Sequence, residues 1–328
     1  TAKDSSLFIP MAVEEAVVLA ERVLFGISCS LHLPALFCLL RVTPPHQAAI
    51  KPFLIACQVS VLISDVYYSV FFVPTFLAEV DLIYCKGLLC LISSTSSAMG
   101  LYIYTIGALA LSTLACIIAR HQGMMPIASA WKMSKKSRRA MIIGVLMTFT
   151  VPTTTFTVLP FSVEESDRLI NESRYDLGWV RDRGRYVKFP NTIFMHVISW
   201  SAITCFIGTL VILISLFSHM FRVLHLETAT STHTKALIRQ SLIRLFVQLN
   251  VPILLIAIPL IILFLQFETD CFPIKSGTVA MSLTPLHPIL HNFVLLFVVP
   301  TYRKVIAEVV CKCRYPSNGS GPTTVRIS

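Results

Sequence analysis

The sequence predicts an all-α membrane protein, a bundle of seven transmembrane helices, on three observations. Apolar residues make up 55% of the 328 residues, whereas Asp, Glu, Lys and Arg together make up 13%, against about 25% in ordinary soluble domains. The apolar residues fall in long blocks, and about 20 of them suffice to cross a bilayer as a helix. The positive charges gather in alternate connections between these blocks, as in multi-pass membrane proteins.

Seven apolar blocks are expected to form the spans. Their bounds are 16–40, 52–78, 87–118, 140–163, 191–219, 241–267 and 278–300. Several contain internal prolines, which a membrane bundle tolerates as kinks because neighbouring groups bond the freed carbonyls. Residues 1–303 are therefore expected to form one helical domain. Residues 304–328 form a tail that we expect to be disordered, above all in its polar part after Cys313.

The charge distribution predicts an N-terminus outside and a cytoplasmic C-terminus. Most of the 27 Lys and Arg residues lie in segments 41–51, 119–139, 220–244 and 301–328. The acidic residues in these segments are Glu227 and Glu308. Because Lys and Arg concentrate in cytoplasmic loops, these four segments are placed inside. Topology accounts for the basic balance, so no nucleic-acid partner is expected.

Five residues are expected to carry covalent features. Asn171 begins an Asn-Glu-Ser sequon in the long outer loop, which predicts glycosylation there. Cys85 and Cys271 lie near the outer ends of spans, in an oxidising compartment, which makes them a candidate disulfide. Cys311 and Cys313 follow the last span directly, a position suited to S-palmitoylation, although two unmodified thiols are an equal alternative.

Polar residues within the spans predict a buried polar core. Asp65 lies near the middle of the second block, and ionisable groups at membrane depth usually face the bundle interior. It is expected to meet Asn250, Asn292 or a histidine such as His291. Two roles stay open for it, a hydrogen-bonded lock between helices and a site for a sodium ion.

The stretch "TPLHPILHNF" raises the alternative of a metal site. His287 and His291 are four residues apart, the spacing of zinc-peptidase helices. Those helices carry a glutamate beside the first histidine, whereas Pro288 stands here, so the general base is missing. A metal-dependent membrane hydrolase using Asp65 as a third ligand is therefore disfavoured, and no metal or other cofactor is expected. A transporter is also disfavoured because no internal repeat is visible.

Four stretches carry a resemblance to a known family. The segment 231–260, with Gln248, Pro252 and Pro259, resembles the sixth-helix region of nematode serpentine chemoreceptors. "LLRVTPPHQAAIKPFLIACQVSVLISD" (39–65) is similar to the first inner loop and second helix of classes H and I of that family. "ARHQGMMPI" (119–127) and "VPTYRK" (299–304) resemble the ends of their third and seventh helices.

The resemblance implies a receptor of sensory neurons, in the plasma membrane of a sensory cilium. It is expected to bind a small molecule outside and to activate a heterotrimeric G protein inside, and it is not an enzyme. Candidate ligand-binding residues, in the outer halves of the helices, are Tyr67, Tyr68, Phe71, Tyr102, His196, Phe264 and His287. Candidate residues for G-protein coupling, at the inner ends, are Arg120, His121, Arg222, Lys235, Arg239, Tyr302 and Arg303.

Overall fold

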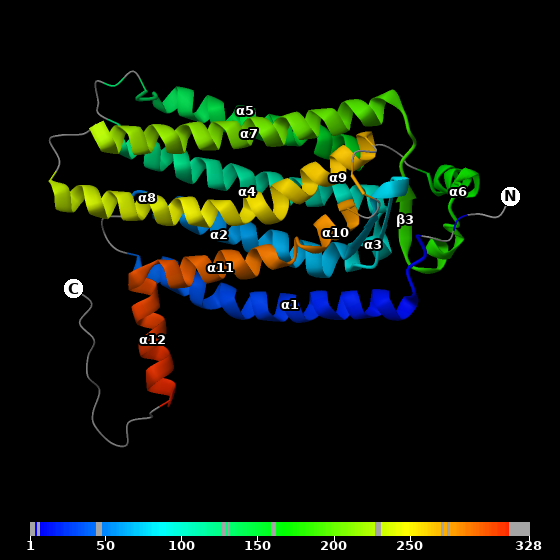
Figure 1. The fold of residues 1–328 in the computed structure, drawn as a ribbon, viewed down its shortest axis with the longest axis horizontal. Helices are drawn as coiled ribbons and strands as arrows, with labels where there is room; N and C mark the ends of the chain where they lie inside the picture. The colour runs from blue at the N-terminus through cyan, green and yellow to red at the C-terminus, as the bar shows by residue number, and fades with distance from the viewer. Residues whose placement is uncertain are drawn as a thin grey trace.

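Long helices lying side by side dominate the structure, a computed structural model (Figure 1). It describes residues 4, 7–43, 48–125, 129, 131–158, 162–226, 231–269, 272–273 and 276–314. In this described part, five helical segments are long and apolar enough to cross a membrane, and six if the bent pair Ser276–Ser282 and Leu286–Val298 counts as one span.

The elements of the bundle follow the predicted blocks with shifted ends. They are α1 (Met11–Phe37) with a π-helical end (Cys38–Val42), α2 (Lys51–Val66) with a π-helical end (Tyr67–Phe72), α4 (Thr95–Met124), α5 (Lys135–Val158), α7 (Ile193–Leu226), α8 (Thr232–Pro252), a π turn (Ile253–Ala257), α9 (Ile258–Glu268), α10 (Ser276–Ser282) and α11 (Leu286–Val298). The axis bends by 42° between α10 and α11. Pro252 stands where α8 passes into the π turn, as expected for a residue without an amide donor.

A three-stranded sheet at the N-terminal end of the bundle was not predicted. β1 (Pro74–Leu77), β2 (Leu82–Cys85) and β3 (Arg185–Lys188) pair antiparallel in that order. The prediction of a second span reaching residue 78 is wrong, because the helix ends at Phe72 and Val73 takes a left-handed conformation with φ 42°. The third block is also divided, since the short α3 (Leu88–Ile92) precedes α4.

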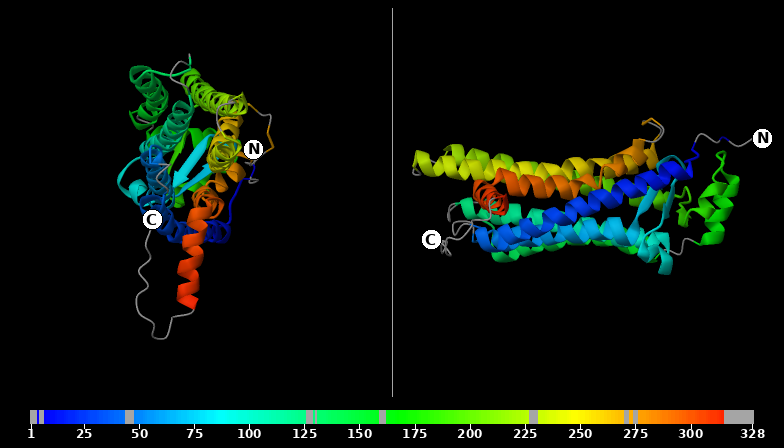
Figure 2. Two further views of the ribbon diagram at one scale, coloured as in Figure 1. Left: turned by 90° about the vertical axis from the view of Figure 1, so that its left-hand side faces the viewer. Right: turned by 90° about the horizontal axis from the view of Figure 1, so that it is seen from below.

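Both faces of this sheet are apolar and covered. On the face toward the bundle, Ile83 and Val187 belong to the main hydrophobic core. On the opposite face, Leu82 and Tyr84 pack with Ile170 of α6 (Val163–Glu172). All four residues of β2 are buried. We call the sheet, α6 and the short 3-10 helix Gly178–Asp182 the outer cap, and Figure 2 shows it at the end of the bundle opposite the last helix.

A buried ion cluster ties the first helix to the outer cap. Glu14 is 4% exposed, and its carboxylate lies 2.6 Å from Lys86 Nζ and also pairs with Arg183. The helix therefore begins at Met11, before the predicted residue 16, because the acidic residue at its start has cationic partners in the cap. Gly87 beside this cluster has no room for a side chain, since a Cβ would lie 2.2 Å from the Phe71 carbonyl oxygen.

At the other end, α12 (Pro300–Arg314) turns away from the bundle (Figure 1). Tyr302 is buried, and its hydroxyl lies 2.8 Å from the Thr43 hydroxyl at the end of the first span. The prediction of disorder is wrong for residues 304–314, which are helical. The rest of the predicted tail, residues 315–328, lies outside the described residues.

Candidate functional site

Four buried side chains from α1, α2 and α11 form a connected polar core. His32 Nε2 lies 3.3 Å from Asp65 Oδ2. Gln58 Nε2 lies 2.9 Å from His32 Nδ1 and donates to Asn292 Oδ1 at 2.6 Å. Asn292 Nδ2 lies 3.2 Å from His32 Nδ1. Because two amide groups point N–H donors at Nδ1, that nitrogen is the acceptor, and the imidazole donates from Nε2 to Asp65.

Among the predicted core residues, Asp65 and Asn292 lie in this network, and His291 lies beside it, 5% exposed. The placement of Asn250 in the core is wrong, because its side chain turns back and donates to the Phe246 carbonyl, four residues earlier in α8. Sequence reasoning missed Gln58. Gln58 and Asp65 are seven residues apart, about two helical turns, so they lie on the same face of the helix. This spacing is the signal in the sequence that could have revealed Gln58.

The predicted aromatic residues of the second and third spans gather below the cap. The ring centroids of Tyr68 and Tyr102 are 5.3 Å apart, and those of Tyr67 and Tyr102 are 6.5 Å apart. Phe264 of α9 belongs to the same core. Phe71 is 40% exposed and stacks on the outer side of Tyr67, so it does not line the interior. The rings thus converge from three elements, with Phe71 left at the periphery.

Three buried polar atoms lie in this outer half: Tyr102 Oη, Thr284 Oγ1 and His287 Nε2. Thr284 lies beside the Tyr102 hydroxyl. His287 follows Thr284 by one helical turn, and its amide donates to the Thr284 carbonyl at 3.0 Å. Buried polar groups normally have partners. The Tyr102 and Thr284 hydroxyls can serve each other, whereas His287 Nε2 has no hydrogen-bond partner among the described residues, so a polar group of another molecule can bind to it.

His196, predicted to bind ligand, lies apart from this cluster at the outer end of α7. Its Nδ1 is 2.7 Å from Glu268 Oε2, and its Nε2 is 2.7 Å from Asn191 Oδ1. The side chain of His196 is 37% exposed, whereas that of Glu268 is 5% exposed. The contact joins the start of α7 to the end of α9. It keeps His196 apart from the aromatic cluster around Tyr102.

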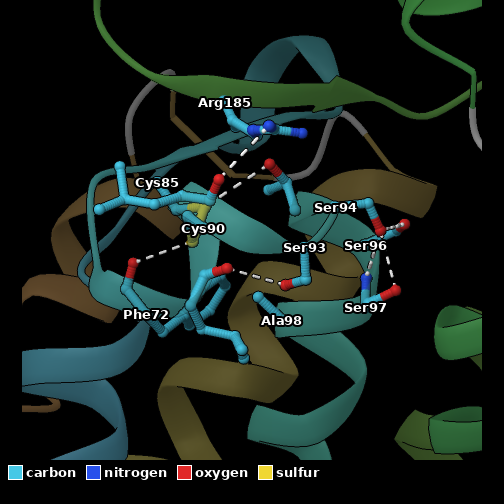
Figure 3. The surroundings of a disulfide bond; sticks show 12 residues. Phe72, Cys85, Cys90, Ser93, Ser94, Ser96, Ser97, Ala98 and Arg185 are labelled. Carbon is cyan, nitrogen blue, oxygen red and sulfur yellow. Dashed lines mark hydrogen bonds between the residues drawn. A yellow bond between two sulfur atoms is a disulfide. The ribbon is translucent and has the colours of Figure 1, made fainter.

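The outer cap contains a disulfide, drawn in Figure 3, between Cys85 at the end of β2 and Cys90 in α3. The predicted bridge from Cys85 to Cys271 is therefore wrong in its partner, and Cys271 lies outside the described residues. The Cα atoms of the bridged pair are 6.1 Å apart, because the turn at Gly87 brings α3 back against the strand. The two cysteines are five positions apart in the sequence, so the bridge fixes a local turn.

The inner ends of the spans expose some of the predicted coupling residues and bury others. His121 is fully buried, with its Nε2 2.9 Å from His219 Nδ1 of α7. His121 and Tyr302 are both buried, so neither side chain is exposed at the inner surface, and their part in coupling stays a prediction. Arg120 is partly buried. The exposed predicted residues are Arg222, Arg239 and Arg303.

A cleft of about 520 Å³ opens between the inner ends of α7 and α8. His225, Lys235 and Arg239 line it together with apolar residues. The cleft thus contains two of the predicted coupling residues, Lys235 and Arg239, and its basic lining is complementary to a negatively charged partner.

The remaining predicted features are located as follows. Asn171 is exposed near the end of α6 and accepts a hydrogen bond of 3.0 Å from Arg181. Cys311 and Cys313 belong to the last turns of α12. Glycosylation and palmitoylation stay predictions. Across the described ranges, no group of three His, Cys, Asp or Glu side chains is placed to hold a metal ion, which removes the geometry that the hydrolase alternative needs.

A comparison with known protein families gives a match. The family model of the serpentine type 7TM GPCR chemoreceptor Srh matches residues 12–312, nearly the whole chain. A search of the curated proteins finds no match. Members of the matched family are receptors and not enzymes. The chain therefore belongs to the Srh family of nematode serpentine chemoreceptors, seven-transmembrane G-protein-coupled receptors that pass through the membrane several times.

Proposed function

We propose that this receptor binds a small molecule on its extracellular side and activates a heterotrimeric G protein at its cytoplasmic side. Membership of the Srh family carries the proposal. We further propose an N-terminus outside, a cytoplasmic C-terminus, and a place in the plasma membrane of a sensory cilium. The Cys85–Cys90 disulfide supports this orientation. Disulfides form in oxidising compartments such as the cell exterior, and this one lies at the same end of the bundle as the N-terminus.

For the ligand we propose a site beneath the cap at the buried side chains of Tyr68, Tyr102 and His287. His287 contributes a buried nitrogen without a hydrogen-bond partner among the described residues, and Tyr102 contributes a buried hydroxyl beside Thr284. The surrounding rings and aliphatic groups of the main core are apolar. Small-molecule sites typically combine a mostly apolar wall with a few polar anchors. A compact, largely apolar molecule carrying one or two hydrogen-bonding groups is the ligand that this arrangement favours.

For the G protein we propose the basic rim formed by Arg120, Arg222, Lys235, Arg239 and Arg303. The cleft lined by Lys235 and Arg239 supports this surface. Anionic lipids of the inner leaflet are the competing partner, because juxtamembrane basic clusters bind them. The lipid alternative predicts that charge alone matters at these positions.

The experiment is a ligand screen in cells that express the full chain, read by a second messenger. Once an active compound is found, we expect Tyr102→Phe or His287→Phe to shift its dose–response curve to higher concentration without lowering the maximal response. Arg239→Ala is expected to lower the maximal response at matched surface expression. Arg239→Lys separates the partners, since it keeps lipid binding but loses bidentate contacts.

Two outcomes contradict the proposal. Unchanged dose–response curves for both outer variants remove the site below the cap. An unchanged maximal response for Arg120→Ala and Arg239→Ala removes these arginines from coupling. Epitope tags on the two termini, tested for accessibility in intact cells, check the orientation independently.

A further inference from the structure

One face of α1 turns into the bundle along the length of the helix. Glu14, Ser28 and Ala35 are buried on this face, at spacings of seven or fourteen residues, which are about two or four helical turns. Glu21 lies on the same face, midway between Glu14 and Ser28, and is partly buried. The first span thus directs two carboxylates toward the bundle, Glu14 near its start and Glu21 two turns deeper.

The two carboxylates differ in their partners. Glu14 pairs with both Lys86 and Arg183 of the outer cap. Across the described part of the chain, the side chain of Glu21 has neither an ion pair nor a hydrogen bond, and the neighbouring cation Arg22 is exposed. A carboxylate inside a span is costly unless a cation or hydrogen-bond donors compensate its charge. Glu21 is therefore a position where a cation of another molecule can bind.

Glu21 lies at the edge of the proposed ligand site. Its carboxylate and the Tyr68 hydroxyl are near enough to interact electrostatically. Tyr68 is 4% exposed, and its ring centroid is 5.3 Å from that of Tyr102. The faces of aromatic rings attract ammonium groups. A carboxylate beside tyrosine rings is thus suited to an ammonium group and repels an anion.

Ser28 adds a polar atom two turns below Glu21. It is 0% exposed, and its Oγ has no hydrogen-bond partner in the described structure. Ser28 lies one turn closer to the cap than His32, which is 3.2 Å from Asn292 of α11. His287 lies just over one turn closer to the cap than Asn292, and α1 and α11 run side by side in the same direction (Figure 1). Ser28 and the unpartnered Nε2 of His287 therefore lie at a similar depth on adjacent helices.

We propose that Glu21 is the counter-ion of a cationic ligand, so that the compounds this receptor recognises are amines that carry a proton at neutral pH. The inference rests on the proposed function as a receptor for small molecules, and it names their chemical class. The ammonium group pairs with Glu21 beside Tyr68. The rest of the ligand extends deeper, where a hydrogen-bonding group reaches Ser28 or His287. A carboxylic acid is the poorest match, because its charge would meet that of Glu21.

The test is thermal unfolding of the purified full chain in phosphatidylglycerol nanodiscs. The probes are ammonium ions from ethylammonium to phenethylammonium, each compared with the alcohol of the same carbon skeleton. We expect at least one ammonium ion to raise the melting temperature of the wild-type protein more than its alcohol does, because a ligand that binds the folded state stabilises it.

Two variants of α1 assign the effect to Glu21. Glu21→Gln keeps the shape of the side chain and removes its charge. It should weaken the binding of the ammonium ion about tenfold to hundredfold, as for the loss of a charged hydrogen-bond partner. Glu15→Gln is the matched control, since Glu15 is exposed on the same helix, and it should leave the shift in melting temperature unchanged.

The proposal is overturned if no ammonium ion raises the melting temperature of the wild-type protein, or if the two variants respond alike. A phosphatidylethanolamine headgroup carries the same ammonium chemistry, so the measurement is repeated with this lipid in the nanodisc. Stabilisation by the lipid that depends on Glu21, without any from the free ions, overturns the role in ligand binding. In the second-messenger screen, activation by a neutral compound that Glu21→Gln leaves unchanged overturns the amine class but keeps the receptor function.

Discussion

His32 and Asp65 lie 3.3 Å apart in the centre of the bundle, with each side chain only 2% exposed. The amides of Gln58 and Asn292 hold the other ring nitrogen of His32 as an acceptor. Three helices therefore fix one tautomer of one ring, and that ring directs its proton to the carboxylate of Asp65. Both ring nitrogens of His32 therefore have hydrogen-bond partners. Loss of the Asp65 carboxylate would leave Nε2 without one, so the stability of the bundle depends on Asp65.

Replacing Asp65 with Ala should lower the thermal stability of the bundle. The substitution leaves the His32 Nε2–H buried without an acceptor, which costs about 1–3 kcal/mol. Thermal unfolding of the purified receptor, followed by thiol-reactive or intrinsic fluorescence, measures the change. Ile63→Ala on the same helix is the control, because Ile63 is 54% exposed on the outside of the bundle. Equal losses for the two variants would show that Asp65 contributes only packing.

Replacing Glu14 with Ala should destabilise the outer cap. Arg183, whose side chain is 7% exposed, would keep a buried charge without its partner, a loss of about 3–5 kcal/mol in comparable buried pairs. Hydrogen exchange of the cap amides reports the change. Glu15→Ala, at an exposed neighbouring position, is the matched control. A double variant Glu14→Ala/Arg183→Leu should recover part of the loss, and no recovery would argue against an ionic origin.

The cysteine pairing can be read by peptide mapping. Lys86 lies between Cys85 and Cys90, so trypsin cleavage after Lys86 should leave two peptides joined by the disulfide, separable only after reduction. Cys90→Ser should free Cys85 for alkylation and cost about 2 kcal/mol, since the closed loop is short. Cys271→Ser should leave the pairing of Cys85 unchanged. Alkylation of Cys85 after Cys271→Ser, but not after Cys90→Ser, would restore the pairing suggested by sequence.

The stability of the outer cap should depend on pH through Asp81, in the turn between β1 and β2. Burial raises the pKa of Asp81 to about 6, against the opposing effect of Lys188. Its carboxyl then binds a proton more readily in the folded than in the unfolded state, where the pKa is about 4. The free energy of unfolding therefore falls as pH rises from about 4 to 6.

Asp81→Asn should remove this slope and raise the melting temperature at pH 7. The left-handed backbone at this position, with φ 52°, suits Asn. Thermal unfolding between pH 4 and 8 measures both effects. Asp182→Asn, at an exposed position in the same cap, should leave the slope in place. A slope that persists in Asp81→Asn would assign it to another group.

Sequence reasoning predicted the long helices of the bundle because their apolar length is a strong local signal, but some of the helices end at other residues than predicted. The apolar start of the segment "PTFLAEVDLIYC" (74–85) was included in the second block, which was predicted to end at residue 78, and only the structure reveals two strands in this segment whose residues are mostly buried. Neither the left-handed Val73 nor the pairing with β3, about a hundred residues away, leaves a local trace. Long-range strand pairing is the part of this fold that a single sequence conceals.

In the candidate site, too, the sequence predicted some features and the structure alone revealed others. Asp65 and Asn292 were expected in the core because polar groups at membrane depth face inward, and they do. Asn250 was expected there for the same reason, but its amide bonds its own helix, a solution that composition cannot distinguish. The pairing of Cys85 depended on the turn at Gly87, which spacing along the chain does not reveal.

The burial of β2 is expected to affect how fast a ligand binds to this receptor and leaves it. With the proposed orientation and ligand site, a molecule that approaches from the outer solvent meets a sheet whose middle strand is buried along its whole length, above the rings of Tyr68 and Tyr102. Arrival at those rings then requires the cap to open or a path through the lipid. Association that waits for such a rearrangement is slower than ordinary docking at about 10⁵–10⁷ M⁻¹s⁻¹, and departure is delayed by the same barrier. The onset and the persistence of a response would then be set by the motion of the cap.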